Sequence, residues 1–376
     1  MPSQGKNHQG YYVGTMTGTS GDGLDISLIE IDESGKVKFV SADTFEFHED
    51  LRKKLISLSY PGANEIELMG QCDTELGHFT SICILKFLAQ LGLTNKQIVA
   101  IGSHGQTIRH RPPSTNNQFP FTIQIGNPHV ITEITNITTV ADFRRRDLAA
   151  GGQGAPLVPA FHRTLFEEKA PKSVILNIGG ISNITVLGEN LLGFDTGPGN
   201  CLMDSWILEN ENEFFDKDGR WASRGKIIKP LLRHLMDDDY FRADPPKSTG
   251  REYFNINWAR DKYSKLNTLN KTDVQTTFCE LTVTTVLFAI EELNPKISEI
   301  IVCGGGRLNT YLMKRLKELA KSPVTTSEVY SIDGDYIEAS AFAWLAYKNL
   351  SGIPANSPLV TGANAHRVLG TVFKRN

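Results

Sequence analysis

The chain has no strong excess of either charge and no long uninterrupted apolar run. Its 39 Lys and Arg residues nearly balance 42 Asp and Glu residues, which gives a net charge of −3. Non-specific nucleic-acid binding needs a basic surface that displaces counterions from phosphates, so this balance argues against that class of protein. The most apolar stretch, residues 82–93, is interrupted by Lys86 and Gln90 and is too short to span a bilayer.

Signs of secretion are also missing. The five cysteines are scattered and contain no C-x-x-C pair, which favours reduced thiols and a cytoplasmic protein. Residues 1–10 are polar and lack the apolar segment of a secretory signal. Cys201 and Cys303 each lie beside a glycine turn, where a thiol nucleophile and a packed small residue are both possible.

The 376 residues predict two or three compact units, and 40% hydrophobic residues are enough to build their cores. Residues 11–31 and 174–187 share one layout: an apolar strand, a glycine-rich turn and a returning strand. Each is followed by a further candidate strand, at residues 37–47 and 191–195. The repeated layout predicts two similar domains with a cleft between them.

Helical patterns separate the predicted strands. Apolar residues recur at a helical period in residues 65–91 and 273–293, and Asp273 is the expected N-cap of the second helix. Short apolar strands are predicted at residues 98–101 and 300–302. Strands that alternate with helices are typical of an α/β architecture with partly parallel sheets.

Three glycine turns follow apolar strands, at residues 18–23, 195–200 and 304–309. Glycine lets backbone N–H groups approach a phosphate, although it also serves ordinary tight turns. No G-x-x-x-x-G-K-[ST] motif occurs, and the first turn has the spacing G-x-x-G-x-G and leads into a strand. These features exclude a P-loop and a dinucleotide fingerprint. They favour a fold that binds phosphates on hairpin turns from two domains.

The longer sequence blocks carry a family resemblance over nearly the whole chain. They are residues 18–25 (GTSGDGLD), 103–107 (SHGQT), 124–128 (QIGNP), 142–159 (DFRRRDLAAGGQGAPLVP), 177–183 (NIGGISN), 194–200 (FDTGPGN), 246–251 (PKSTGR), 303–307 (CGGGR), and Glu338 with 341–345 (AFAWL). In these blocks the chain resembles the anhydro-N-acetylmuramic acid kinases of the actin/hexokinase/Hsp70 superfamily. Gly21 departs from the family, which usually has a bulky apolar residue there, and predicts a more mobile first loop.

The resemblance implies an α/β fold of two actin-like (ribonuclease H-like) domains around a central nucleotide and sugar cleft. Domain I would comprise residues 1–137 and about 338–376, and domain II residues 138–337. The implied enzyme is a cytoplasmic, homodimeric phosphotransferase of peptidoglycan recycling, with no nucleic-acid or membrane partner. It would use ATP, Mg²⁺ and one water to open the 1,6-anhydro ring of anhydro-N-acetylmuramic acid and phosphorylate O6.

The same resemblance implies roles for individual residues. Asp195 matches the catalytic base that takes the proton of the attacking water; the residues alone equally allow an Asp that caps its own turn. Arg144 and Glu338 match sugar-contacting residues, and Gly197 and Asn200 are expected in the substrate site. ATP phosphates are expected on Gly18, Thr19, Ser20, Gly21, Asp22, Gly23, Leu24 and Asp25, and adenosine on Gly304, Gly305 and Gly306.

Some alternatives stay open from the sequence. Asp22 or Asp25 could hold Mg²⁺ through water, but no cluster of protein ligands for a metal is evident. Lys247 and Arg251 are either solvated charges or active-site residues. Two other functions remain possible: a kinase of the same superfamily that phosphorylates an ordinary sugar hydroxyl, and a non-catalytic nucleotide switch in which ATP only shifts domain closure.

Overall fold

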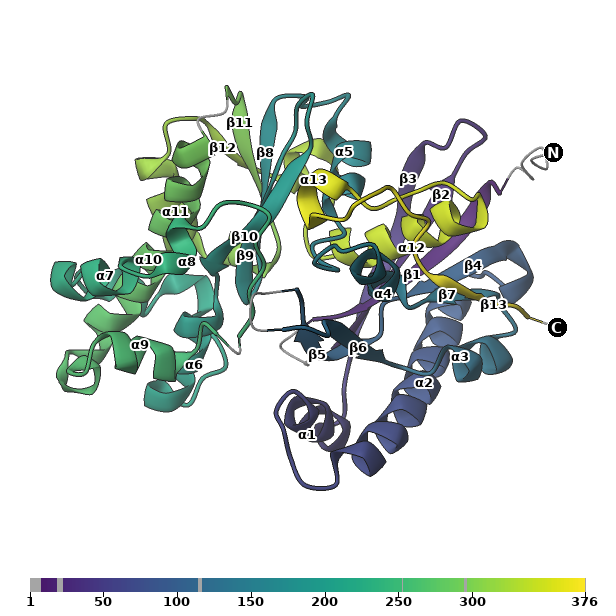
Figure 1. Cartoon of the computed structure of the whole chain (residues 1–376), viewed down its shortest axis with the longest axis horizontal. Helices are drawn as coiled ribbons and strands as arrows, with labels where there is room; N and C mark the ends of the chain where they lie inside the picture. The colour runs from purple at the N-terminus through teal and green to yellow at the C-terminus, as the bar shows by residue number, and fades with distance from the viewer. Residues whose placement is uncertain (1–7, 19–22, 114–116, 252, 294–295, 376) are drawn as a thin grey trace. The chain divides into compact units, whose positions relative to one another are not determined.

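The computed structural model describes residues 8–18, 23–113, 117–251, 253–293 and 296–375. The chain forms two compact units, one of residues 1–165 and 336–376 and the other of residues 166–335 (Figure 1). The polypeptide leaves the first unit at Leu165 and returns to it at Tyr336. No helix within the described ranges is long and apolar enough to cross a membrane.

The first unit is built on a mixed sheet with the strand order β13-β7-β4-β1-β2-β3. Strands β1, β2 and β3 form an antiparallel meander, whereas β4 runs parallel to β1 and β7 parallel to β4. The bounds are β1 Gly10–Thr17, β2 Gly23–Ile31, β3 Val37–Glu46, β4 Ile98–Ser103, β7 Thr139–Ala141 and β13 Thr371–Phe373. A separate hairpin pairs β5 (Gln106–Arg111) with β6 (Phe121–Ile125).

Helices cover both faces of this sheet because successive strand residues point to opposite sides. Val13 faces a core that includes residues of α1 (Glu49–Leu58), α2 (Glu65–Gln90) and α3 (Pro128–Thr135). Its neighbour Gly14 faces α12 (Ile337–Leu350), and a Cβ at Gly14 would stand 1.8 Å from the Ala339 carbonyl oxygen. Glycine is therefore required where α12 lies against β1.

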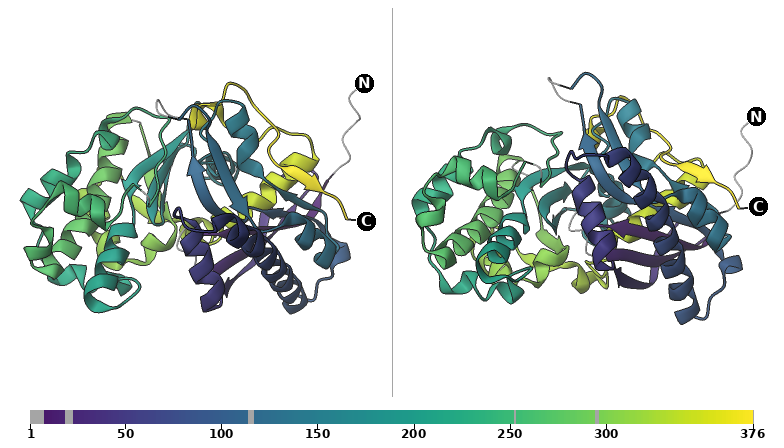
Figure 2. Two further views of the ribbon diagram at one scale, coloured as in Figure 1. Left: turned by 60° about the horizontal axis from the view of Figure 1, so that its bottom comes forward. Right: turned by 90° about the horizontal axis from the view of Figure 1, so that it is seen from below.

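The second unit repeats the strand order, with β10-β9-β8-β11-β12. Strands β8, β9 and β10 are antiparallel, β11 is parallel to β8 and β12 to β11. Figure 2 shows the teal strands of this unit beside its green helices. The bounds are β8 Ser173–Ile178, β9 Ile181–Val186, β10 Leu192–Pro198, β11 Glu299–Cys303 and β12 Val324–Thr326. Its core also draws on α6 (Cys201–Glu211), α7 (Lys229–Met236), α9 (Ile256–Lys262), α10 (Lys271–Leu293) and α11 (Thr310–Leu319).

The predicted α/β class with two actin-like units is confirmed, and both strand–turn–strand stretches form hairpins. One helix start is corrected: α10 begins at Lys271, because the Asn270 side chain accepts hydrogen bonds from the amides of Thr272 and Asp273. Residues 138–165, which the sequence places in domain II, pack with the first unit, where β7 pairs with β4. All five cysteines are buried and none forms a disulfide bond, as packing of small residues predicts.

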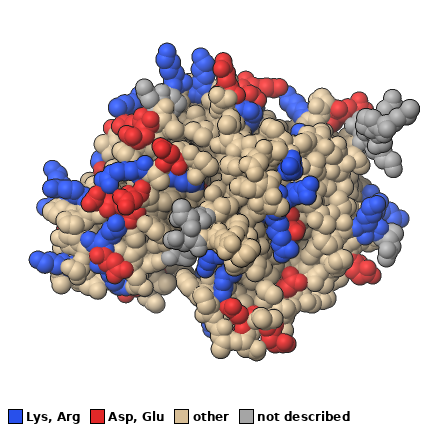
Figure 3. Space-filling model, viewed as in Figure 1, with Lys and Arg blue, Asp and Glu red and all other residues tan. Residues whose placement is uncertain are grey.

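Positive and negative side chains are interspersed on the face of the molecule that Figure 3 shows. Exposed ion pairs of the molecule include those of Arg220 with Asp218 and of Arg242 with Asp237. The surface thus agrees with the nearly neutral composition and gives no basic stripe on that face for a nucleic acid.

Candidate active site

Asp195 lies in β10 at a break in the strand pairing. The register of β10 against β9 shifts between Asp195 and Gly197, which is a β-bulge. Gly197 has a φ of +141°, and a Cβ there would stand 2.7 Å from the Phe241 ring, so the bulge needs glycine. Bulges re-aim side chains near active sites, and this one leaves Asp195 half-buried.

Two neighbouring segments hold Asp195 in place. Its carboxylate Oδ2 accepts a hydrogen bond of 2.9 Å from the Thr249 amide, and its own amide donates to the Lys247 carbonyl. The hydroxyl of Tyr240 donates to the Asp195 carbonyl at 2.8 Å. Burial, followed by the Asp195 charge, raises the pKa of Tyr240, so its hydroxyl remains a donor. The position of the carboxylate is therefore set by contacts far away in the sequence.

The Lys247 side chain holds the segment before Thr249 in place. Its ammonium donates to the carbonyls of Tyr240 and Phe241 at 2.9 and 3.2 Å and lies 5.0 Å from the centre of the Tyr240 ring. Burial lowers the pKa of Lys247. Lys247 is therefore not a freely solvated charge: it lies beside Asp195, and its ammonium fastens the segment before Thr249.

The β8–β9 turn, Gly179–Gly180, lies against the segment that follows Asp195. The Gly180 carbonyl accepts hydrogen bonds from the amides of Gly199 and Cys201, and the Gly179 carbonyl accepts one from the Asn200 amide. Asn200 is the N-cap residue of α6. The expected site residues Asp195, Gly197 and Asn200 are thus brought together beside a second glycine turn.

The third glycine segment, Gly304–Gly306, follows β11 and lies against the end of β8. A Cβ at Gly306 would stand 2.3 Å from Ile178 Cγ2, and one at Gly304, where φ is +75°, would stand 2.2 Å from Asn177 Oδ1. Outside its own short segment of chain, no described residue has a heavy atom within 4 Å of a Cβ built on Gly305. Gly305 therefore faces open space, as a residue beneath a bound nucleotide would.

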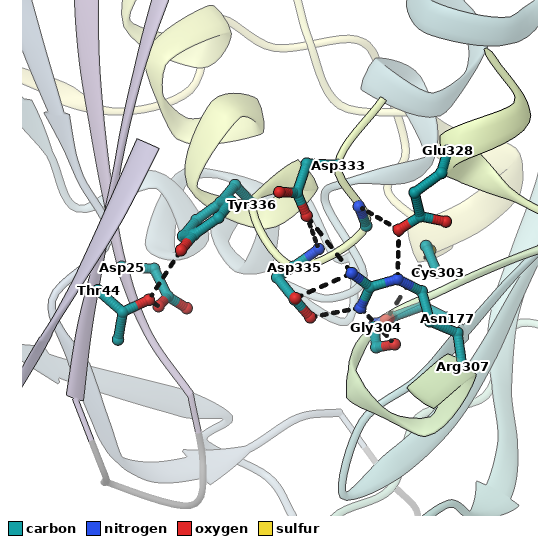
Figure 4. A network of polar contacts seen from close by, with 11 residues as sticks. Asp25, Thr44, Asn177, Cys303, Gly304, Arg307, Glu328, Asp333, Asp335 and Tyr336 are labelled. Carbon is teal, nitrogen blue, oxygen red and sulfur yellow. Dashed lines mark hydrogen bonds and ion pairs between the residues drawn. The ribbon is translucent and has the colours of Figure 1, made fainter. Parts of the chain in front are cut away.

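Arg307 fastens this segment to the stretch that leads out of the second unit. Figure 4 shows its guanidinium among the carboxylates of Glu328, Asp333 and Asp335, with a further hydrogen bond to the Gly304 carbonyl. The side chain of Arg307 is only 7% exposed, and these acids raise its pKa even though burial opposes the shift. Arg307 is a structural residue that the sequence analysis does not single out.

Arg144 and Glu338 lie close together in the first unit, on α4 (Phe143–Ala149) and α12. Desolvation raises the pKa of Glu338, and the positive charge of Arg144 partly offsets that effect. Arg145, the next residue in the run of three arginines 144–146, pairs with Asp142 at 3.5 Å. Of the three arginines, Arg144 is the one whose charge acts on the pKa of Glu338.

His104, which was not predicted, orients Arg144. The Arg144 Nε–H donates to His104 Nε2 at 2.9 Å, and His104 Nδ1 lies 2.6 Å from the Gly105 carbonyl oxygen. Since the arginine can only donate, Nδ1 carries the proton and the imidazole is neutral. Burial, with the charge of Arg144, holds the pKa of His104 well below its usual range. The SHGQT block, residues 103–107, was the available signal.

The first glycine turn is only partly described. Gly18 follows β1, which ends at Thr17, whereas Gly23, Leu24 and Asp25 begin β2. Asp25 Oδ1 accepts a hydrogen bond of 2.7 Å from Thr44 (Figure 4). The expected phosphate-binding residues Thr19, Ser20, Gly21 and Asp22 lie outside the described residues. Among the residues that are described, no group of three or more His, Cys, Asp or Glu side chains could hold a metal ion.

The repeated sheet order, with glycine turns at the strand ends, defines an actin-like α/β protein. Over residues 10–375 the chain matches the family described as anhydro-N-acetylmuramic acid kinase, and it belongs to that family.

Curated relatives carry the same name. A Vibrio vulnificus anhydro-N-acetylmuramic acid kinase is 44% identical over 368 residues, which are 97% of this chain and 98% of the relative. One from Pasteurella multocida is 43% identical over 369 residues, 97% of each chain. One from a Shewanella species is 45% identical over 367 residues, 96% of this chain and 98% of the relative.

Solved structures are similar at much lower identity. Component A of (R)-2-hydroxyglutaryl-CoA dehydratase from Acidaminococcus fermentans is 11% identical with a TM-score of 0.44, covering 91% of this chain and 99% of that one. A glucokinase of the ROK family from Streptomyces griseus, solved with glucose and AMPPNP, is 12% identical with a TM-score of 0.38, covering 90% and 100%.

Proposed function

We propose that this protein transfers the terminal phosphoryl group of ATP to O6 of 1,6-anhydro-N-acetylmuramic acid while water opens the anhydro ring. The products are N-acetylmuramic acid 6-phosphate and ADP, and the reaction belongs to peptidoglycan recycling. Membership of the kinase family over residues 10–375 and relatives of that name at 43–45% identity support the proposal.

The observation that carries the mechanism is the fixed carboxylate of Asp195. Water attacks C1 of the sugar, the C1–O6 bond breaks, and O6 attacks the terminal phosphorus as the bond to ADP breaks. Asp195 accepts the proton of the water. Its place at the bulge, held by Thr249 and Tyr240, fits a base that must keep one orientation. A positioned base of this kind contributes about 10²–10⁴-fold to the rate.

Arg144 and Glu338 are the proposed sugar-binding pair. Arg144 uses Nε for His104 and Nη1 for the Gly154 carbonyl, at 2.9 Å each, and these two bonds fix the plane of its guanidinium. A fixed guanidinium suits the lactyl carboxylate of the sugar, which it can bind through two parallel hydrogen bonds. Glu338 would position the sugar near its reacting centre. Gly197 and Asn200 would complete the substrate site beside Asp195.

ATP would lie with its adenosine on Gly304–Gly306 and its phosphates on Gly18–Asp25. The open space at Gly305 supports the first placement. Mg²⁺ is commonly bound by one or two carboxylates together with substrate phosphates, which agrees with the lack of a three-residue metal cluster in the described parts of the chain. Asp25, held by Thr44, is the described carboxylate that could take part. The metal would neutralise phosphate charge.

We also propose a cytoplasmic homodimer whose partners are the sugar and ATP alone. The five buried cysteines, none of them in a disulfide bond, support a reducing compartment, and the balanced charge supports the absence of a nucleic-acid partner. The homodimer rests on the family resemblance.

The test is to compare Asp195→Asn with the wild type for sugar phosphorylation and for ATP binding. Activity should fall by about 10²–10⁴-fold while ATP affinity stays within a few-fold, because the amide cannot accept the proton. Asp261→Asn, a change at an exposed residue of α9, should leave both unchanged. Unaltered turnover in Asp195→Asn would refute the mechanism.

A second assay separates ring opening from transfer to an ordinary hydroxyl. In ¹⁸O-water the product should carry label at C1, because water supplies that oxygen. A phosphorylated product without label would reject ring opening. Release of ADP that the anhydrosugar does not stimulate would instead favour a nucleotide switch.

A further inference from the structure

Arg251 presents an unused guanidinium group at the β8–β9 turn. A Cβ built on Gly180 would stand 2.7 Å from Arg251 Nε and 2.8 Å from Nη2, so the guanidinium lies directly over this glycine. Its Nε is buried without a hydrogen-bond partner. None of the hydrogen bonds or ion pairs between described residues involves this guanidinium.

Other cations near Arg251 in the sequence have partners. Lys247 donates to two carbonyls, Arg260 pairs with Glu209 at 2.6 Å, and Lys262 pairs with Asp238 at 2.9 Å. A buried donor that the protein itself leaves unsatisfied is rare in native structures and calls for an explanation such as a missing ion. An anionic ligand satisfies that requirement for Arg251.

The position of Arg251 is next to the candidate base. Thr249, two residues before it, donates its amide to the Asp195 carboxylate. Gly180, beneath the guanidinium, accepts hydrogen bonds from Gly199 in the turn that follows Asp195. The Ser248 hydroxyl in the same segment is also buried without a partner. Arg251 and Asp195 therefore lie on segments of the second unit that are hydrogen-bonded to one another.

We infer that Arg251 binds the transferred phosphoryl group, an assignment that rests on the proposed kinase function. As O6 forms its bond to phosphorus and the bond to ADP breaks, negative charge is spread over the three non-bridging oxygens. A guanidinium binds two such oxygens with parallel charge-assisted hydrogen bonds. Asp195 takes the proton of the attacking water, so Arg251 neither gains nor loses a proton in the reaction.

A purely structural role for Arg251 makes a different prediction. If its guanidinium only packed on the turn, moving it should alter stability without changing phosphate binding. Gly180→Ala provides this perturbation, because the three atoms nearest the new Cβ belong to the flexible end of Arg251, and the φ of Gly180 is not positive. The substitution displaces the cation and retains its charge.

The experiment compares Arg251→Gln, Arg251→Lys, Gly180→Ala and the double variant Arg251→Gln/Gly180→Ala with the wild type. Arg260→Gln, at an arginine with a protein partner, is the matched control. Thermal melting first establishes that each variant folds. Sugar phosphorylation then gives kcat and KM, and calorimetry measures the binding of inorganic tripolyphosphate and of N-acetylmuramic acid 6-phosphate.

We expect Arg251→Gln to lower kcat by about 10²–10³-fold, as the loss of a donor to developing charge does. Arg251→Lys should recover part of this loss, because it keeps the charge but not the two-pronged geometry. Gly180→Ala should resemble Arg251→Gln, and the double variant should lose nothing more, since both changes remove one interaction. Weakened tripolyphosphate binding assigns the contact to the nucleotide phosphate, and weakened sugar-phosphate binding assigns it to the product.

The assignment is overturned if folded Arg251→Gln keeps kcat and both affinities within twofold of the wild type. It is also overturned if Gly180→Ala lowers melting temperature alone. Failure of the proposed function looks different: the wild type would not phosphorylate the anhydrosugar, yet tripolyphosphate binding would still depend on Arg251.

Discussion

Asp238 should be one of the most sensitive structural positions of the second unit. Its carboxylate is 3% exposed and accepts hydrogen bonds from Tyr240 N, Tyr253 Oη, Trp258 Nε1 and Lys262 Nζ at 2.9–3.0 Å. It also caps α8 (Asp239–Arg242). Asp238→Ala removes the acceptor of all four hydrogen bonds at once and leaves the Lys262 ammonium without its carboxylate.

The expected loss is about 3–5 kcal/mol in the free energy of unfolding, the usual effect of breaking a buried charge pair. For a unit of this size, 1 kcal/mol lowers the melting temperature by about 2–4 °C, so a fall of roughly 6–20 °C follows. Burial alone would raise the pKa of Asp238, but hydrogen bonds from Lys262, Trp258, Tyr240 and Tyr253 outweigh it and lower the pKa.

Because the pKa of Asp238 is lowered, the stability lost in Asp238→Ala should depend on pH. The ionised carboxylate stabilises the folded state above the ordinary Asp pKa, and this contribution disappears as pH falls through the lowered value. The difference in unfolding free energy between wild type and Asp238→Ala should therefore be largest near neutral pH and shrink in acid. Urea titrations monitored by tryptophan fluorescence, at several pH values, measure that difference.

The adjacent residue is the control. The Asp239 side chain is fully exposed and its ion pair with Arg242 is 4.0 Å long, so Asp239→Ala should change stability by about 0.5 kcal/mol or less. Activity should fall with stability in Asp238→Ala, because Tyr240 donates to the Asp195 carbonyl. If both alanine variants have equal stability, the argument from buried hydrogen bonds is wrong.

Two further predictions concern the candidate site. Gly305→Ala should leave stability unchanged and weaken nucleotide binding, whereas Gly306→Ala should lower the free energy of unfolding by about 1–3 kcal/mol, because its Cβ would overlap Ile178. Denaturation and nucleotide titration of both variants test these two effects. Equal stability of the two variants would contradict the prediction. Glu338→Gln should become more stable relative to the wild type as pH rises above about 4.5: the raised pKa means that the folded wild type holds its proton longer than the unfolded chain and loses stability on ionisation. A pH-independent difference would contradict the burial of that charge.

Most helices and strands could be predicted because they depend on the pattern of residues close together in the sequence. The hairpins β1–β2 and β8–β9 follow from apolar strands around glycine turns, and α2 follows from its apolar period. The boundary of the units depends on β7, only three residues long, and its pairing with β4 is not visible in the sequence around it. The start of α10 was wrong because both Asn270 and Asp273 can cap a helix, and only the folded backbone selects one.

The site was predictable only as far as family blocks reach. Asp195 was singled out because it lies in the family block of residues 194–200, since the residues alone equally allow a turn cap. The contacts that hold it come from Tyr240 and Thr249, about 50 residues away. His104 could not be assigned, because its role depends on the tautomer that Arg144 imposes. Contacts of this kind arise from tertiary packing and leave no spacing in the sequence.

Hydrogen-bond partners separate structural charges from candidate functional ones in this protein. Asp147 is fully buried, and its carboxylate accepts bonds from Gly154, Asn356 and Thr361, all within the first unit, so folding itself explains why it is there. Arg307 is explained in the same way by three carboxylates in the second unit. Arg251 has a buried donor that no described residue accepts, although a charge without a partner destabilises the fold. A ligand that accepts hydrogen bonds from the Arg251 guanidinium best explains why this destabilising charge is present.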